Sequence, residues 1–184
     1  MLAFNLTLFA LGTTIIFWVS RASLNILGSH GFFRFFAWET ILVMFVLNSK
    51  YWFYDPFSPN QVVSWFFLVI SLLLITLGVI QLRRMGNVKK ERSDPGLVGL
   101  ERTTKLVTTG LYRYIRHPFY SSLLFLAWGI ACKSISIWEV FLAILATIFL
   151  ILTARKEEIE NIAFFGDEYN EYMLYTKMFI PYIF

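Results

Sequence analysis

Five apolar runs separated by polar segments dominate the pattern of this chain. The longer runs contain about 20 residues, which is the length an α-helix needs to cross the hydrocarbon core of a bilayer. The runs cover residues 2–20, 32–47, 62–82, 118–132 and 135–153. A tight turn near Lys133 and Ser134 joins the short fourth run to the fifth, so these two are predicted to form an antiparallel hairpin. The pattern predicts an all-α integral membrane protein with about five transmembrane helices.

The segment after residue 154 has a different, mixed pattern. It predicts a helix that ends at Gly166 and a second short helix capped by Asp167. On that second helix Tyr169, Tyr172 and Tyr175 recur every three residues, which is typical of an amphipathic helical tail lying on the membrane surface.

The whole chain, residues 1–184, is predicted to be a single domain. Residues 1–82 would form three spans, residues 83–117 a polar loop, and residues 118–184 the helical hairpin and the tail.

Composition agrees with a membrane protein, and charge gives its orientation. Apolar residues make up 58% of the chain and charged residues 15%, more apolar surface than a soluble domain of this size can hide. Fourteen of the 16 Lys and Arg residues fall in segments predicted to share one side, leaving Lys50 and Lys133 opposite. The positive-inside rule then places the N-terminus outside and residues 83–117 and the tail in the cytoplasm. The membrane would be the inner or plasma membrane of a prokaryote, or the endoplasmic reticulum of a eukaryote.

Several classes of site are not expected. Cys132 is the only cysteine and there are two histidines, so neither a disulfide framework nor a metal site is predicted. The net charge of +4 follows from the way membrane proteins distribute Lys and Arg, so nucleic acid is not an expected partner. Membrane lipids are expected partners.

The stretch LVTTGLYRYIRHPFY, residues 106–120, is the first place to look for a site. Gly110 can adopt backbone conformations that other residues resist. Pro118 suits the first position of a helix, and His117 would then be the cap residue. The stretch is therefore predicted to be a structured loop that brings Tyr112, Arg116 and His117 to the mouth of a membrane helix.

A pair of glutamates, Glu157 and Glu158, follows the fifth run and would lie near His117 if the hairpin forms. Simpler interpretations exist for each group. His117 could be a cap or interface histidine. The glutamates could belong to a solvated helix face on which Lys156 pairs with Glu160.

Glu39, inside the second run, is a candidate functional carboxylate, but it could equally pair with Arg34 or Arg21.

The combination of motifs is more specific than any part of it. The run GLYRYIRHPFY is followed by an apolar hairpin, then EE, FGDEYNEY and IP. This arrangement closely resembles the isoprenylcysteine carboxyl methyltransferase family and its prokaryotic relatives, over residues 104–181. The three earlier runs match the family only in number and hydrophobicity.

The resemblance implies a membrane-embedded methyltransferase that uses S-adenosylmethionine and needs no metal. The cofactor would lie in a cytoplasm-facing pocket formed by the loop, the hairpin and the tail. Its sulfonium and ammonium groups suit a carboxylate and aromatic faces. Carried over position by position, the cofactor-binding residues would be Thr104, Lys105, Leu106, Val107, Tyr112, His117, Pro118, Phe119, Tyr120, Glu157 and Glu158.

The substrate half of the motif differs from the family pattern. An arginine thought to face the substrate carboxylate is replaced by Thr153, and Arg155 is the candidate substitute for the substrate-facing role. Asn161 stands where a leucine is common, and Met178 where an arginine is common. The acceptor is therefore expected to be lipophilic or amphipathic, bearing an isoprenylcysteine-like carboxylate or another membrane-borne carboxylate, thiol or amine.

Two other functions fit parts of the pattern. An NADPH-dependent membrane sterol or steroid reductase has a similar loop before a late helix, typically with an N-Y-x-G-E motif, whereas this chain has HPFYSS. A non-catalytic membrane scaffold or sensor would leave the RHP loop and the glutamate pair unexplained.

Overall fold

The computed structural model describes residues 2–86 and 103–184, and every regular element in that part of the chain is helical. Four helices are long and apolar enough to cross a membrane, and α4 is a shorter apolar helix. The prediction of an all-α, multi-pass membrane protein is confirmed. The elements are α1 (Leu2–Leu24), α2 (His30–Leu47), η1 (Ser49–Tyr51), α3 (Pro59–Met85), η2 (Gly110–Arg113), α4 (Pro118–Ala131), α5 (Ile137–Phe165) and α6 (Asp167–Tyr175).

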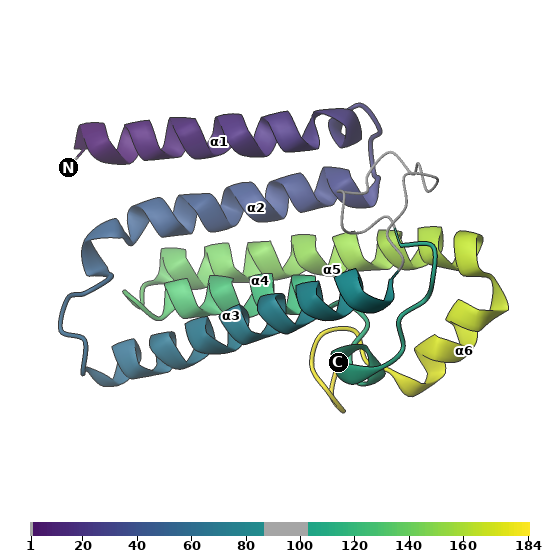
Figure 1. Ribbon diagram of the computed structural model, residues 1–184. Helices are drawn as coiled ribbons and strands as arrows, with labels where there is room; N and C mark the ends of the chain where they lie inside the picture. The colour runs from purple at the N-terminus through teal and green to yellow at the C-terminus, as the bar shows by residue number, and fades with distance from the viewer. Residues whose placement is uncertain (1, 87–102) are drawn as a thin grey trace.

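The long helices run side by side, and α6 turns away from the end of α5 (Figure 1). Helix α3 packs mainly on α4, and α2 packs on α5 and α1. Helix α1 is the outermost of the five apolar helices, α1 to α5. It buries almost nothing in the protein, as expected of a helix that faces lipid. The predicted hairpin of α4 and α5 is confirmed. The C-terminal segment folds back beneath the start of α4 (Figure 1).

Small and hydroxyl-bearing residues join α3 to α4. The Ser64 hydroxyl donates to the Gly129 carbonyl at 2.6 Å, and the Ser71 hydroxyl donates to the Ser122 carbonyl at 2.7 Å. A Cβ on Gly129 would come within 3.1 Å of the Leu68 side chain. Close backbone approach and interhelical hydrogen bonds are the usual means of helix association in lipid, where apolar burial gives little drive.

Helix α5 continues well beyond the predicted end of the fifth run, to Phe165. Gly166 ends it with a positive φ of 63°, as predicted. The expected capping by Asp167 is wrong, because Gly166 occupies the cap position and Asp167 is the first residue of α6. Both glutamates of the pair therefore lie within a continuous helix.

The end of the bundle away from α6 buries Lys133, which the charge pattern had placed apart from most basic residues. Its Nζ donates to Gln61 Oε1 at 2.9 Å and lies 3.6 Å from the Trp65 ring centroid. The side chain is 2% exposed, and burial lowers the pKa of this ammonium. Lys133 thus connects the turn between α4 and α5 to α3.

The hydroxyl of Thr13 on α1 donates to Glu39 Oε2 at 2.9 Å, so Glu39 helps to join the first two helices.

Candidate active site

The loop before α4 is anchored to α3 at one glycine. Gly110 has a φ of 63°, and a Cβ at this position would lie 2.4 Å from Gln81 Nε2. The next residue, Leu111, donates its N–H to Gln81 Oε1 at 2.8 Å. Any side chain at position 110 would displace this contact, and the left-handed φ itself favours glycine. The predicted need for conformational freedom at Gly110 is confirmed.

The C-terminal segment pairs with the same loop through its backbone. Lys177 donates its N–H to the Tyr114 carbonyl at 3.0 Å, and Arg116 donates to the Lys177 carbonyl at 2.8 Å. His117 donates its N–H to the Met178 carbonyl at 3.2 Å, and the Ser121 hydroxyl reaches the Phe179 carbonyl at 2.8 Å. Residues distant in sequence therefore fix the entry into α4 together.

Pro118 is the first residue of α4 and His117 occupies the cap position, as predicted. The His117 side chain does not cap the helix. Its Nε2 lies 3.3 Å from Glu158 Oε1. Arg116 Nε donates to the same carboxylate oxygen at 2.7 Å and Nη1 donates to the Thr176 carbonyl. Glu158 therefore holds the RHP loop and the tail together from α5.

Glu157 reaches a different set of partners. It accepts a hydrogen bond from the Tyr120 hydroxyl, and its Oε2 lies 3.9 Å from His117 Nδ1. The rings of His117 and Tyr120 stack with centroids 5.4 Å apart. The interpretation of the glutamates as a solvated face is wrong. Glu160 pairs with His30 Nδ1 at 2.5 Å on α2, not with Lys156 as that interpretation required.

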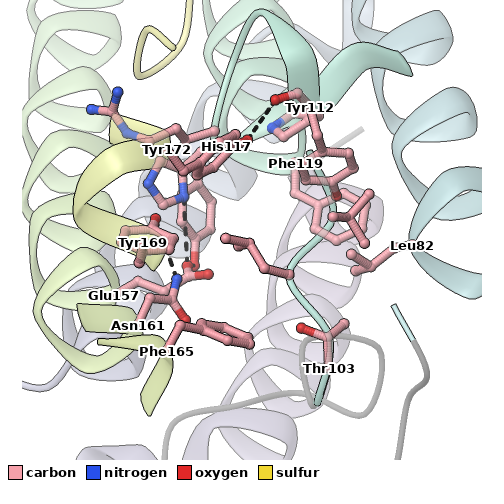
Figure 2. A pocket seen from close by; sticks show the side chains of 15 residues that line it. Leu82, Thr103, Tyr112, His117, Phe119, Glu157, Asn161, Phe165, Tyr169 and Tyr172 are labelled. Carbon is pink, nitrogen blue, oxygen red and sulfur yellow. Dashed lines mark hydrogen bonds and ion pairs between the residues drawn. The ribbon is translucent and has the colours of Figure 1, made fainter. Parts of the chain in front are cut away.

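A polar pocket opens between the loop, α4, α5 and α6 (Figure 2). Its enclosed volume is about 70 Å³. Glu157 and Asn161 give it a polar side (Figure 2). Six phenylalanine and tyrosine rings also line it, those of Tyr112, Phe119, Tyr120, Phe165, Tyr169 and Tyr172. Burial raises the pKa of Tyr169 and of Tyr172, so both hydroxyls stay protonated at physiological pH.

Most of the residues expected to bind the cofactor line this pocket. They are Leu106, Val107, Tyr112, His117, Pro118, Phe119, Tyr120 and Glu157. Thr104 and Lys105 are not among the lining residues, although the adjacent Thr103 is. Glu158 lies behind the wall, where it orients Arg116 and His117.

Besides Thr103, the sequence interpretation missed five lining residues, and helix spacing could have found two of them. Asn161 and Phe165 follow Glu157 by four and eight residues, so they share its face of α5. Tyr169 and Tyr172 turn inward from α6, whereas Tyr175 is 84% exposed. The interpretation of α6 as an amphipathic helix on the membrane surface did not include this role of its tyrosines, two of which line the pocket. Leu82 from α3 completes the lining.

Arg155, the candidate for the substrate-facing role, is exposed and lines neither this pocket nor the apolar cavity described below. Thr153 is fully buried, and its hydroxyl donates to the Phe149 carbonyl in its own helix. The two positions therefore lie on different faces of α5.

A second, apolar cavity of about 320 Å³ lies between α2, α3 and α4; we call it the lateral cavity. This volume is at the lower end of the range of about 300–1,000 Å³ usual for ligand pockets. Phe119 and Tyr120 line both this cavity and the polar pocket. The two spaces therefore share one wall, at the start of α4. The residues lining the lateral cavity are Arg34, Trp38, Ser71, Ile75, Val79, Phe119, Tyr120, Ser122, Leu123 and Leu126.

Comparison with known proteins identifies the family. The family model described as phospholipid methyltransferase matches residues 63–167, more than half of the chain. The chain belongs to this family. The matched region runs from α3 through α5 to the start of α6, so it contains the RHP loop, the hairpin and both glutamates.

Individual relatives confirm the resemblance seen in the sequence. A probable protein-S-isoprenylcysteine O-methyltransferase from Oryza sativa subsp. japonica is 31% identical over 132 residues, which are 68% of this chain and 66% of that protein. Protein-S-isoprenylcysteine O-methyltransferase B from Arabidopsis thaliana is 31% identical over 134 residues, covering 69% and 66% of the two chains. Methanethiol S-methyltransferase 1 from Bradyrhizobium diazoefficiens is 33% identical over 87 residues, covering 47% and 30%.

These matches leave part of each relative uncovered. The chain spans 66% of the length of the plant relatives, just under two thirds. No solved structure is significantly similar to it.

Within this phospholipid methyltransferase family member, one hydrogen bond docks α6 over the pocket. The Tyr172 hydroxyl donates to the Tyr112 carbonyl at 2.6 Å (Figure 2). Replacing Tyr172 with phenylalanine is expected to lower the free energy of unfolding by about 0.5–1.5 kcal/mol, the usual net value of such a bond. Thermal unfolding in mild detergent measures this. Tyr175→Phe, at an exposed position of the same helix, is the matched control, and equal melting temperatures for the two variants would contradict the docking role.

Proposed function

We propose that this protein transfers a methyl group from S-adenosylmethionine, bound in the polar pocket, to a lipophilic acceptor that occupies the lateral cavity. The observation that carries the proposal is the wall shared by the two spaces, formed by Phe119 and Tyr120. A polar donor and a lipid-soluble acceptor need compartments of opposite character that meet at one point. Membership of the methyltransferase family supports the same assignment.

The residues of the polar pocket fit the methyl donor. S-adenosylmethionine carries a sulfonium and an ammonium, and the pocket offers the Glu157 carboxylate together with the rings of Tyr112, Phe119, Tyr169 and Tyr172. Cations are stabilised by carboxylates and by aromatic faces. The enclosed volume of about 70 Å³ is below the usual range for ligand pockets, so the lining has to open to admit a group of this size.

When bound, S-adenosylmethionine supplies an activated methyl carbon. The protein contributes alignment and exclusion of water, which are the main requirements of an in-line displacement. Glu157 would bind a cationic group, and Tyr120, whose hydroxyl donates a hydrogen bond to Glu157, would fix that carboxylate relative to the shared wall. Glu158, which does not line the pocket, would hold the RHP loop in register through its ion pair with Arg116.

Orientation and location follow from the basic residues. We place the polar pocket on the cytoplasmic side and the N-terminus outside, because most Lys and Arg residues lie on the side of the RHP loop. The loop segment that carries several of these charges, residues 87–102, lies outside the described residues.

The acceptor is tested by comparing chain lengths. The names of the relatives include both a lipidated cysteine and methanethiol, so both kinds of acceptor belong in the assay. We expect a farnesylated cysteine thioether to be methylated at least tenfold faster than its short-chain analogue, since each buried CH₂ contributes about 0.8 kcal/mol and remote binding energy positions the reacting atom.

Radiolabelled methyl transfer to the two thioethers, a lipid amine and a small thiol gives the measurement. Equal rates for long and short acceptors, or a preference for the small thiol, would mean that the acceptor comes from water. The lateral cavity would then have no role in catalysis.

A further inference from the structure

A single charged residue, Arg34, is among the residues that line the lateral cavity. It lies in the second turn of α2 and is 1% exposed. Its guanidinium carbon sits 4.9 Å from the ring centroid of Trp38, one helical turn further along and also part of the lining. The remaining walls are apolar apart from the hydroxyls of Ser71, Ser122 and Tyr120.

A buried guanidinium is costly unless anionic or aromatic groups compensate it. Glu157 lies close enough to Arg34 to interact with it electrostatically, and the Trp38 ring adds a cation–π contact. A guanidinium also carries five N–H donors in a planar fork. It can therefore hold a carboxylate through two parallel hydrogen bonds while keeping its contacts within the protein.

We propose that Arg34 is the specificity-determining residue of the acceptor site, and that it selects amphipathic acceptors with a carboxylate head group. This proposal rests on the proposed function and names its substrate class. An apolar cavity with one buried cation is complementary to an apolar tail with one anionic head. Thr153, which replaces the arginine expected on α5, cannot supply that cation, and Arg155 is exposed. In this chain the cation comes from α2.

The position of Arg34 fits the transfer step. Arg34 and Tyr120 line the same cavity, and Tyr120 contacts Glu157 on the other side of the shared wall. A carboxylate held at Arg34 would form an O–CH₃ bond as the S–CH₃ bond of the sulfonium breaks. The products are a neutral ester and a neutral thioether, so no proton has to be moved. The ester no longer carries the charge that Arg34 binds, which favours its release.

Binding to the full-length protein in detergent, without S-adenosylmethionine, tests the proposal. The probes are S-dodecyl-N-acetylcysteine, its carboxamide and its methyl ester, which differ only in the head group. We expect the wild-type protein to bind the carboxylate about ten- to a hundredfold more tightly than either neutral probe, as for a charge-assisted hydrogen-bonded pair. Arg34→Gln should bring this ratio close to one. Arg34→Lys, which keeps the buried charge but loses the fork, should retain part of it.

Two other arginines serve as comparisons. Arg21→Gln removes an exposed arginine from α1, outside the cavity, and should leave the ratio unchanged. Arg155→Gln should also leave it unchanged. No preference in the wild-type protein, a preference retained by Arg34→Gln, or a loss seen only in Arg155→Gln would each overturn the assignment. Because the assay omits the methyl donor, failure to bind S-adenosylmethionine would count against the proposed function and not against Arg34.

Discussion

Replacing Glu157 with glutamine is expected to weaken S-adenosylmethionine binding about ten- to a hundredfold. The Glu157 carboxylate is the acidic group among the residues lining the polar pocket. The other polar groups of the lining are the Arg116 guanidinium, the His117 imidazole and neutral side chains. A neutral amide keeps the shape of the side chain but loses a charge-assisted contact to a cation, which is worth about 1.5–3 kcal/mol. Equilibrium binding to the detergent-purified protein measures the change.

The matched control is Glu171→Gln, on an exposed position of α6. It removes the same charge from the same end of the protein, so a general electrostatic effect would appear in both variants. Unchanged affinity in Glu157→Gln, or an equal loss in the control, would show that Glu157 does not contact the methyl donor.

Replacing Glu158 with alanine is expected to destabilise the protein by about 3–5 kcal/mol, the cost of breaking a buried ion pair by removing one partner. The side chains of Arg116 and Glu158 are each 9% exposed, and Arg116 also donates to the Thr176 carbonyl. Removing the carboxylate leaves a buried guanidinium at the junction of the loop, α5 and the tail. Urea-induced or thermal unfolding in detergent measures the loss.

The double variant Arg116→Met with Glu158→Leu separates the ion pair from the packing around it. Replacing both charges by apolar groups of similar size removes the uncompensated cation, so we expect most of the stability to return. Glu168→Ala, at an exposed position of α6, is the control for loss of a surface carboxylate. A Glu158→Ala variant as stable as this control would show that the pair contributes nothing to the folded state.

The sequence predicted the membrane helices and the frame of the site because each rests on a local signal. Apolar run length located the spans. The left-handed turn at Gly110 and the start of α4 at Pro118 follow from the backbone freedom of one residue and the restriction of the other. The nearness of Glu157 to His117 followed from the hairpin and from the resemblance to a known family.

The features that the sequence did not predict depend on whether two helical segments are continuous and on which way a helix faces. The fifth apolar run stops near residue 153 and a further helix ending at Gly166 was predicted after it, but the two form the single helix α5, which runs to Phe165. That continuation turns Asn161 and Phe165 toward the pocket. Burial of His30 against Glu160 requires α2 to lie beside α5, a contact between segments far apart in the chain.

The same limit applies to Arg34. A single arginine close to the start of an apolar run, as Arg34 is, usually indicates a position at the membrane interface. Its place in the lateral cavity depends on how α2, α3 and α4 are arranged around it, and no spacing within α2 indicates that arrangement.

Calorimetric titration of the purified protein with S-adenosylmethionine and, separately, with NADPH tests the central claim most directly. A methyltransferase site requires saturable heat with S-adenosylmethionine that is reduced in Glu157→Gln, and no saturable heat with NADPH. Saturable binding of NADPH alone would instead support a membrane reductase. Binding of neither compound would support a non-catalytic membrane protein, and either result would contradict the function proposed for the two spaces that meet at Phe119 and Tyr120.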